Sequence, residues 1–278
     1  MVELRQDDDY VRGGPLPPVA RTALRRLAVA GRSVARGAGF VFDAVLPPLC
    51  LACAAPVDSH GAVCADCWTG IAFVAAPHCA VCGMPFEFDQ GAGAACGACL
   101  RTPPAFDRAR AVMRYGDVSR RLVVGFKHGD RTHGAPAFGR WLARAGAALA
   151  AEADIVAPVP LHWRRLAHRR FNQAALLAGA FVAALPKGNA PHLVPDLLVR
   201  RRPTPTQGGL GAVARRRNVR GAFALRGDAD GVAGRRVLLV DDVLTTGATV
   251  GECARVLRAA GATGIDVLTL ARVDRPGA

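Results

Sequence analysis

Long hydrophobic runs are missing from this chain of 278 residues. A membrane-spanning helix needs about 18 or more consecutive apolar residues, so the sequence predicts no transmembrane span. A secretory leader is not expected either, because Asp7, Asp8 and Asp9 lie where a signal peptide carries basic residues. We therefore expect a cytoplasmic protein.

Acidic residues are few relative to basic ones. The chain has 36 Lys and Arg against 22 Asp and Glu, a net charge of +14. Residues 46–105 hold one Arg and four acids, whereas residues 106–278 hold 28 basic and 13 acidic residues, a net charge of +15. Such a region favours anionic partners: nucleic acid, a membrane surface or phosphorylated substrates. Aromatic residues make up only 6%, so contacts with nucleic acid would rest mainly on phosphates.

Three regions follow one another along the chain. Residues 1–45 are expected to form a disordered tail and a basic amphipathic helix over 19–45, which packs on the protein or, alternatively, lies on a membrane or acts as a transit peptide. Residues 46–105 are rich in cysteine and turn residues. Residues 106–278 alternate strand and helix patterns, which predicts an α/β domain with a mainly parallel sheet flanked by helices.

The elements expected in this last region can be read from its periodicity. Strands are predicted over 108–115, 155–159, 237–240 and 265–271, and helices over 117–127, 135–151, 171–185, 210–218 and 248–260.

Eight of the nine cysteines form four Cys-x-x-Cys pairs within 50 residues. The pairs are Cys50 and Cys53, Cys64 and Cys67, Cys79 and Cys82, and Cys96 and Cys99. Two such pairs complete a tetrahedral Zn(Cys)4 site, so the sequence predicts two structural zinc ions in a double zinc ribbon. Disulfides and iron–sulfur or redox chemistry are the alternatives. The sequential partition of ligands is simplest, but a cross-braced one and a ligand role for His78 stay open. The ninth, Cys253, is predicted to be a small core residue.

A second motif follows the apolar strand Val237–Val240. Asp241 and Asp242 emerge where open α/β sheets bind ligands. The small residues Thr245, Thr246, Gly247, Ala248 and Thr249 come next, before a helix. Backbone N–H groups at a helix start, together with threonine hydroxyls, suit a phosphate monoester, and two carboxylates beside it suit the hydroxyls of a ribose.

This loop resembles the phosphoribosyl-diphosphate loop of type I phosphoribosyltransferases, and the whole pattern resembles the ComF family. That bacterial family joins a double zinc ribbon to a phosphoribosyltransferase-like domain. The resemblance covers about residues 45–273. It rests on Cys50 to Cys99, Phe126-Lys127, Pro158-Val159-Pro160-Leu161-His162, Arg165, Phe171-Asn172-Gln173, Arg200, Thr204, Gln207, Leu210, Arg216, Asn218 and Asp241 to Thr249.

The resemblance implies a binding site for phosphoribosyl diphosphate and Mg²⁺. Asp241 and Asp242 would hold the ribose hydroxyls, and Thr245 to Thr249 would wrap the 5-phosphate. The segment Pro158, Val159, Pro160 to Arg165 occupies the position of the diphosphate loop, Lys127 belongs to the matched site, and Arg200 to Gln207 resembles a flexible lid. Arg170 departs from the family, which usually has glycine there.

The resemblance leaves the activity open. Purine-type enzymes of this fold place an acidic general base where this chain has Thr245. One hypothesis is therefore a binding protein that acts in DNA uptake (natural competence) or DNA handling, together with competence or DNA-processing proteins. Another is a phosphoribosyltransferase with an unidentified acceptor, and a third is a structural adaptor held by zinc.

Arginine clusters point to single-stranded DNA as a further partner. The candidates are Arg164, Arg169, Arg170, Arg200, Arg201 and Arg202, with Trp163 and Phe171 as stacking residues. A solvated basic face is the alternative reading of these residues.

Overall fold

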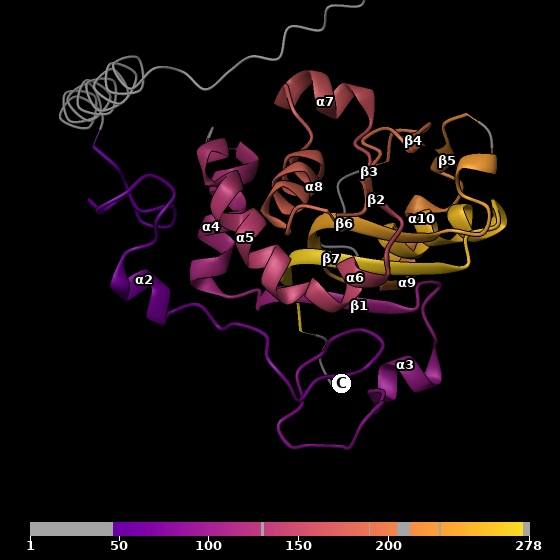
Figure 1. Cartoon of the computed structure of the whole chain (residues 1–278), viewed down its shortest axis with the longest axis horizontal. Coiled ribbons are helices and arrows are strands. Elements are labelled where there is room, and N and C mark those ends of the chain that lie inside the picture. The colour runs from indigo at the N-terminus through magenta and orange to yellow at the C-terminus, as the bar shows by residue number, and fades with distance from the viewer. Residues whose placement is uncertain (1–46, 129–130, 189, 205–211, 228, 275–278) are drawn as a thin grey trace, which may run out of the picture. The chain divides into compact units, whose positions relative to one another are not determined.

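A computed structural model describes residues 47–128, 131–188, 190–204, 212–227 and 229–274 (Figure 1). The predictions for residues 1–45 lie outside these ranges, and Pro48–Ala278 belong to one compact unit. The helices are α2 (Ala65–Thr69), α3 (Gly97–Arg101), α4 (Asp117–His128), α5 (Ala135–Ala145), α6 (Ala147–Glu152), α7 (Trp163–Arg169), α8 (Gln173–Ala184), α9 (Ala212–Val219) and α10 (Ala248–Ala259), with short 3-10 turns η1 (Arg131–Gly134) and η2 (Ala229–Gly231). The strands are β1 (Arg108–Arg114), β2 (Ile155–Pro158), β3 (His192–Leu193), β4 (Leu198–Arg200), β5 (Phe223–Leu225), β6 (Arg236–Leu244) and β7 (Gly264–Arg272). In these ranges no helix is long and apolar enough to cross a membrane.

Five strands form one sheet in the order β1-β7-β6-β2-β3, and every neighbouring pair is parallel. Strands β4 and β5 form a separate antiparallel pair. Parallel strands need crossovers, which the helices between them supply. The predicted α/β class with a parallel sheet is therefore confirmed.

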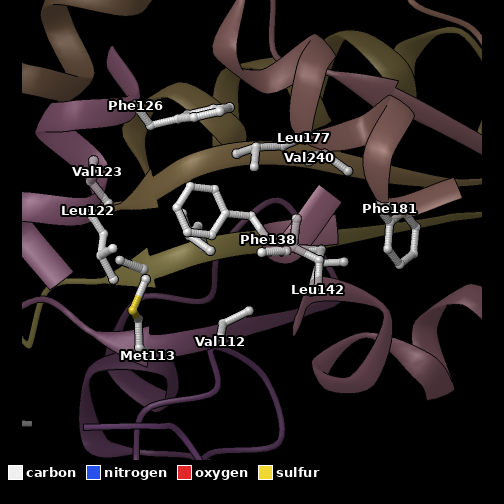
Figure 2. Close-up of a cluster of buried hydrophobic side chains, with 14 of the residues drawn as sticks. Val112, Met113, Leu122, Val123, Phe126, Phe138, Leu142, Leu177, Phe181 and Val240 are labelled. Carbon is white, nitrogen blue, oxygen red and sulfur yellow. The ribbon is translucent and has the colours of Figure 1, made fainter. Parts of the chain in front are cut away.

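Helices cover both faces of the sheet, because its strands are apolar on both sides. Along β6, Leu238 and Val240 face one cluster of buried side chains, and Val237 and Leu239 face the other. The first cluster includes Phe138 and is built with α4, α5 and α8 (Figure 2). The second is built with α10, β4 and β5. Two buried faces on one sheet make the three-layer arrangement.

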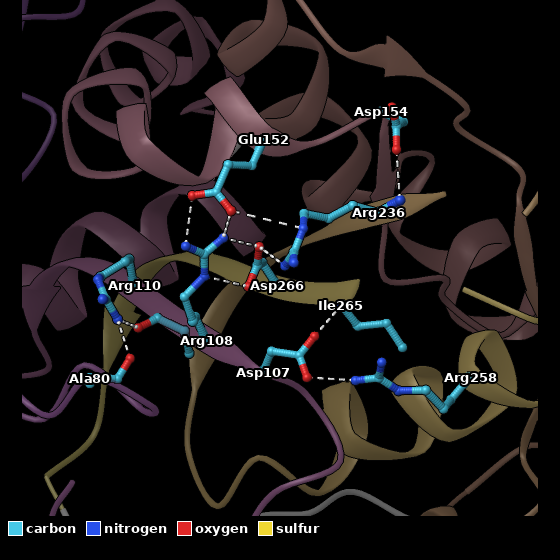
Figure 3. A network of polar contacts seen from close by, with 11 residues as sticks. Ala80, Asp107, Arg108, Arg110, Glu152, Asp154, Arg236, Arg258, Ile265 and Asp266 are labelled. Carbon is cyan, nitrogen blue, oxygen red and sulfur yellow. Dashed lines mark hydrogen bonds and ion pairs between the residues drawn. The ribbon is translucent and has the colours of Figure 1, made fainter. Parts of the chain in front are cut away.

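Ion pairs join the strands at their amino ends (Figure 3). Asp266 on β7 is fully buried and accepts hydrogen bonds from Arg108 Nη2 at 2.8 Å and Arg236 Nη1 at 3.2 Å. Arg108 also bonds Glu152, at 2.8 and 2.9 Å. These contacts link β1, β7 and β6 at the end of the sheet opposite the polar segment after β6.

The cysteine-rich region lies along the outer edge of β1. The Ala109 N–H donates to the carbonyl of Val81 at 2.6 Å, and the Val74 N–H donates to that of Val112 at 2.9 Å. A Cβ added at Gly83 would meet the oxygen of Ala109 at 2.5 Å, so only glycine allows this approach. The region thus covers an edge strand that would otherwise expose unpaired backbone groups.

Two predicted elements show the largest differences from the structure. The helix expected over 135–151 is divided into α5 and α6 at Gly146, whose added Cβ would lie 2.6 Å from a methyl of Leu268 on β7. The strand expected over 237–240 continues to Leu244, because its ladder with β7 runs on to Leu244 and Arg272. Asp241 and Asp242 therefore lie on β6 itself and not in the loop after it.

Smaller differences concern α7 and α8. The helix expected over 171–185 begins at Gln173, because the Asn172 side chain caps it by accepting the Ala174 N–H at 3.1 Å. Helix α7 and strands β3, β4 and β5 are short, and their few residues showed no clear periodicity.

A ligand cavity at the sheet edge and two cysteine clusters

A cavity of about 330 Å³ lies at the carboxyl ends of β2 and β6. It is lined by Lys127, Val159, Pro160, Leu161, Arg169, Asn172, Gln173, Ala174, Arg200, Arg215, Asp241, Asp242, Val243, Leu244, Thr245, Gly247, Ala248, Thr249 and Val250. Four basic side chains and two acidic ones face this space. The cavity is therefore electrostatically suited to an anionic ligand.

Most residues predicted to bind the sugar phosphate come together here. Pro158 and Thr246 are not among the lining residues, although their chain neighbours are. The side chain of Arg165 lies outside the described part of the chain. The periodicity of the sequence did not indicate Arg169 or Arg215 as lining residues, since their place depends on how α7 and α9 pack.

The two carboxylates differ in their surroundings. Asp242 forms an ion pair with Lys127, with Nζ and Oδ2 2.8 Å apart. Asp241 accepts the Asp242 N–H at 2.9 Å. Burial raises the pKa of Asp241 to about 7, and the charge of Asp242 acts in the same direction, against the attraction of Lys127 and Arg200. The ionised form of Asp241 is thus disfavoured in the unliganded cavity. A ligand that supplies hydroxyl donors or positive charge would stabilise it.

The segment after β6 has the geometry of an anion-binding turn. Gly247 adopts φ 74°, a left-handed conformation that favours glycine, and caps the N-terminus of α10. The Thr246 hydroxyl accepts the Ala248 N–H at 3.4 Å. Helix α10 has no acidic residue in its own first turn, so no carboxylate of that turn offsets the positive end of the helix dipole.

Asn172 and Gln173 hold the opposite wall of the cavity. Asn172 Nδ2 donates to the carbonyl of Val159 at 3.1 Å, and Gln173 Nε2 donates to that of Lys127 at 3.3 Å. These bonds connect α8 with the segment after β2 and with the end of α4. Arg170, just before them, adopts φ 66°, the conformation that glycine would take more easily.

The arginines predicted to contact DNA fall into different environments. Arg164, Arg170 and Arg201 are exposed, and Arg164 stacks over the exposed ring of Trp163 at 5.3 Å. Arg202 is exposed but donates to the carbonyls of Asn218 and Arg220.

Arg169 and Arg200 line the cavity instead. Arg200 is buried, bonds Thr204 and lies over the ring of Phe223 at 5.2 Å. Because Arg200 is buried, it is unsuited to contact single-stranded DNA bound at the surface.

The eight paired cysteines form two clusters in sequential order. Cys50, Cys53, Cys64 and Cys67 make the first, and Cys79, Cys82, Cys96 and Cys99 make the second, with all sulfurs of a cluster within 4.8 Å of one another. This arrangement agrees with the sequential partition and not with cross-bracing. Neither cluster includes His78, which is half-buried. The pKa of His78 is lowered mainly by this burial and, to a smaller extent, by the positive charge of Arg110.

Both clusters fit a tetrahedral zinc ion. Cys53 and Cys64 sulfurs lie 3.6 Å apart, and those of Cys82 and Cys96 lie 3.7 Å apart. Zinc–sulfur bonds of about 2.3 Å place tetrahedral ligands about 3.8 Å from one another. Burial raises the pKa of Cys50, but backbone N–H groups, including that of Cys64 at 3.3 Å, lower it overall to about 6. The donor set and spacing are those of structural Zn(Cys)4 sites.

Comparisons with known proteins agree with both regions. A double zinc ribbon model matches residues 41–100, and a phosphoribosyl transferase domain model matches residues 193–277. The chain is 34% identical over 236 residues to the DNA utilization protein YhgH of Escherichia coli O157:H7, covering 82% of this chain and 98% of that one. It is 32% identical over 209 residues to Competence protein F of Haemophilus influenzae, covering 70% of this chain and 85% of that one.

Among solved structures, one similar chain is a phosphoribosyltransferase from Corynebacterium diphtheriae. It is 19% identical, with a TM-score of 0.31, covering 56% of this chain and 84% of that one.

Proposed function

The chain belongs to the ComF family, and on this basis we propose that it binds phosphoribosyl diphosphate with Mg²⁺ and acts in DNA uptake or DNA handling. The observation that carries the ligand is the meeting of Asp241 and Asp242 with the turn Thr245 to Thr249 in one basic cavity. Two proteins that this chain resembles are named for DNA utilization and for competence.

Each part of the ligand has a matching group in the cavity. The carboxylates of Asp241 and Asp242 suit the paired ribose hydroxyls, and the N-terminus of α10 suits the 5-phosphate. The diphosphate would lie near the segment Pro158 to Pro160 and the basic side chains. Mg²⁺ takes oxygen ligands, which the diphosphate itself and one of these carboxylates offer.

The cavity favours binding over transfer. Of the lining residues, the only carboxylates are Asp241 and Asp242, and none is a histidine. Thr245 cannot take a proton from an acceptor as a carboxylate would. Transfer to an acceptor that is already anionic is the second candidate. Screening candidate acceptors for diphosphate release separates the two hypotheses. Turnover would favour a phosphoribosyltransferase, and binding without turnover would favour a binding protein.

Calorimetry with phosphoribosyl diphosphate and Mg²⁺ tests the binding site. The variant with Asp241→Asn and Asp242→Asn should bind more weakly by about 2–4 kcal/mol, because two charge-assisted hydrogen bonds are lost. Asp196→Asn, at a surface carboxylate that is 64% exposed, should leave the affinity unchanged. Equal affinity of the wild type and the double variant would refute the assigned roles.

The same titration should depend on pH. The pKa of Asp241 is raised to about 7 before ligand binds, and the ribose hydroxyls need the ionised carboxylate as acceptor. Affinity should therefore rise between pH 6 and pH 8, and Asp241→Asn should flatten this slope. A wild-type affinity that falls over this interval would contradict the ionised form as the binding form.

We propose that single-stranded DNA contacts exposed arginines on α7, at the C-cap of α7 and directly after β4. Arg164, Arg170, Arg201 and Arg202 are the exposed candidates, so binding should depend steeply on salt and little on sequence. Labelled single-stranded DNA titrated with and without saturating phosphoribosyl diphosphate tests this. Competition means a shared site, independence means a separate one, and no binding at about 50 mM salt ends the hypothesis.

A further inference from the structure

Arg272, the last residue of β7, is a buried cation with no carboxylate partner among the described residues. Its side chain is 2% exposed, and none of the ion pairs in these ranges includes it. One guanidinium nitrogen, Nη1, donates to the carbonyl of Cys82, and the buried Nε has no hydrogen-bond partner. A buried guanidinium is costly unless a negative charge lies near it.

The second cysteine cluster can provide that negative charge. Four thiolates around one Zn²⁺ carry a net charge of −2. Arg272 approaches this cluster from β7, and Arg110 approaches it from β1 by donating to the carbonyl of Ala80 at 3.1 Å. Arg110 also has no ion pair among the described residues. Arg272 and Arg110, neither of which has a carboxylate partner among the described residues, thus both approach the cluster that is predicted to carry the charge of −2.

The first cluster has a related but weaker contact. Arg131 donates to the carbonyl of Leu51 at 2.8 Å, between Cys50 and Cys53. Its side chain is only half-buried, so solvent screens much of its charge. The first cluster is therefore a natural control for the second.

Arg272 is also next to the segment Thr245 to Thr249, the proposed 5-phosphate site, which is called the phosphate turn below. It pairs in register with Leu244, the residue before Thr245, and the Val273 N–H donates to the carbonyl of Leu244 at 2.9 Å. The lining of a cavity of about 210 Å³ includes Cys82 and Cys99 as well as Thr246 to Ala248. The second cluster and the phosphate turn are thus walls of the same space.

We propose that Arg272 is a positioning residue that couples the second metal centre to the phosphate turn. The metal–thiolate dianion neutralises Arg272 and fixes the end of β7, and β7 in turn holds Leu244 and the turn that follows. Occupancy of the second centre, and not of the first, then sets the affinity for a phosphorylated sugar. The ligand part of this inference rests on the proposed function.

Removing each centre in the full chain tests the coupling. Cys96→Ser with Cys99→Ser should leave about one zinc per chain and weaken binding of phosphoribosyl diphosphate with Mg²⁺ by about tenfold or more. Cys64→Ser with Cys67→Ser should also leave one zinc, with affinity within about twofold of the wild type. Equal effects of the two pairs would overturn the coupling.

Variants of Arg272 give a second readout with all eight cysteines in place, in case a cysteine variant does not fold. Arg272→Met should speed the release of one of the two zincs to a chelator by about tenfold and weaken the sugar phosphate, whereas Arg272→Lys, which keeps the charge, should largely restore both. Unchanged zinc release in Arg272→Met would overturn the counter-charge role. If the wild type binds no phosphoribosyl diphosphate, the proposed function fails, and zinc release still decides the role of Arg272.

Discussion

The two halves of the cysteine-rich region share one backbone plan but are supported in different ways. The Cys50 N–H donates to Ala55 O and the Cys79 N–H donates to Met84 O, both at 2.7 Å. The residue after each first pair is left-handed, with φ 63° at Ala54 and 67° at Gly83. Since the same metal-binding turn is made twice, differences between the halves must come from what each packs against.

Their surroundings divide the two halves clearly. The first half rests on aromatic rings, with Trp68 and Phe73 against Trp141 of α5 at 5.7 and 6.0 Å. Both halves are hydrogen-bonded to the backbone of β1, the first through Val74 and the second through Val81, and the second is also contacted by the buried Arg272. All four cysteines of the second cluster are buried, whereas Cys53 of the first is exposed. The half contacted by a buried arginine is the one beside the turn Thr245 to Thr249, so the two copies of the motif differ in what they adjoin.

Metal removal should separate the two halves most strongly. We expect two zinc ions per chain, and removal of either should unfold the half that holds it, because metal binding here is coupled to folding. A chelator should remove zinc in two phases, the first cluster emptying first because Cys53 is accessible. Cys64→Ser with Cys67→Ser should delete the fast phase. Release in a single phase would contradict the difference in protection, and one zinc or none in folded, reduced protein would refute the two sites.

Gly83→Ala should be the most damaging small change in the region. The new Cβ would meet the oxygen of Ala109 at 2.5 Å and would force alanine into a left-handed conformation. We expect the free energy of unfolding to fall by about 2–5 kcal/mol in denaturant titrations. Gly91→Ala is the control: it has φ 87° but nothing within 4 Å of an added Cβ, so it should cost only about 1 kcal/mol. Similar losses for both variants would mean that the approach to β1 does not matter.

Trp141→Ala should act on the first half alone. Its ring contacts Trp68, Phe73 and Phe138, and truncation of a half-buried tryptophan should cost about 2–3 kcal/mol. Zinc release from the first cluster should become faster, while the slow phase should stay unchanged. Trp163→Ala, at a ring that is 65% exposed, is the matched control without effect. Acceleration of both phases would show that the halves are not supported independently.

Ala54→Gly should have the smallest effect and the opposite sign. Relief of the left-handed alanine should raise the free energy of unfolding by about 0.5–1 kcal/mol. Arg170→Gly tests the same physics away from the metal, since Ala54 and Arg170 are the two residues other than glycine with positive φ in the described ranges. Chemical denaturation of both variants should show the gain. Destabilisation by Ala54→Gly would mean that its side chain contributes a contact that outweighs the strain.

Much of the site was predictable because its chemistry is local in the chain. The two-residue spacing of each cysteine pair determines that both sulfurs reach one ion, and the segment Asp241 to Thr249 contains both carboxylates and the turn that we propose binds phosphate. The left-handed conformation of Gly247 is likewise a local property, because it lies in the turn between β6 and α10. Short elements such as α7, β3, β4 and β5 were missed, because a few residues carry too little periodicity to stand out.

The sequence by itself determined the two sets of cysteine pairs, the adjacent carboxylates, the small-residue segment that follows them and the parallel α/β class, since each depends on residues close together or on a repeating apolar pattern. Only the tertiary structure decided which cysteines share an ion, that Asp241 and Asp242 lie on β6, and that Lys127 pairs with Asp242. It also decided that Arg200 and Arg272 are buried while Arg164 is exposed. The physical reason is that the burial of a charge, its partner and its pKa depend on residues brought together by strand order and helix packing.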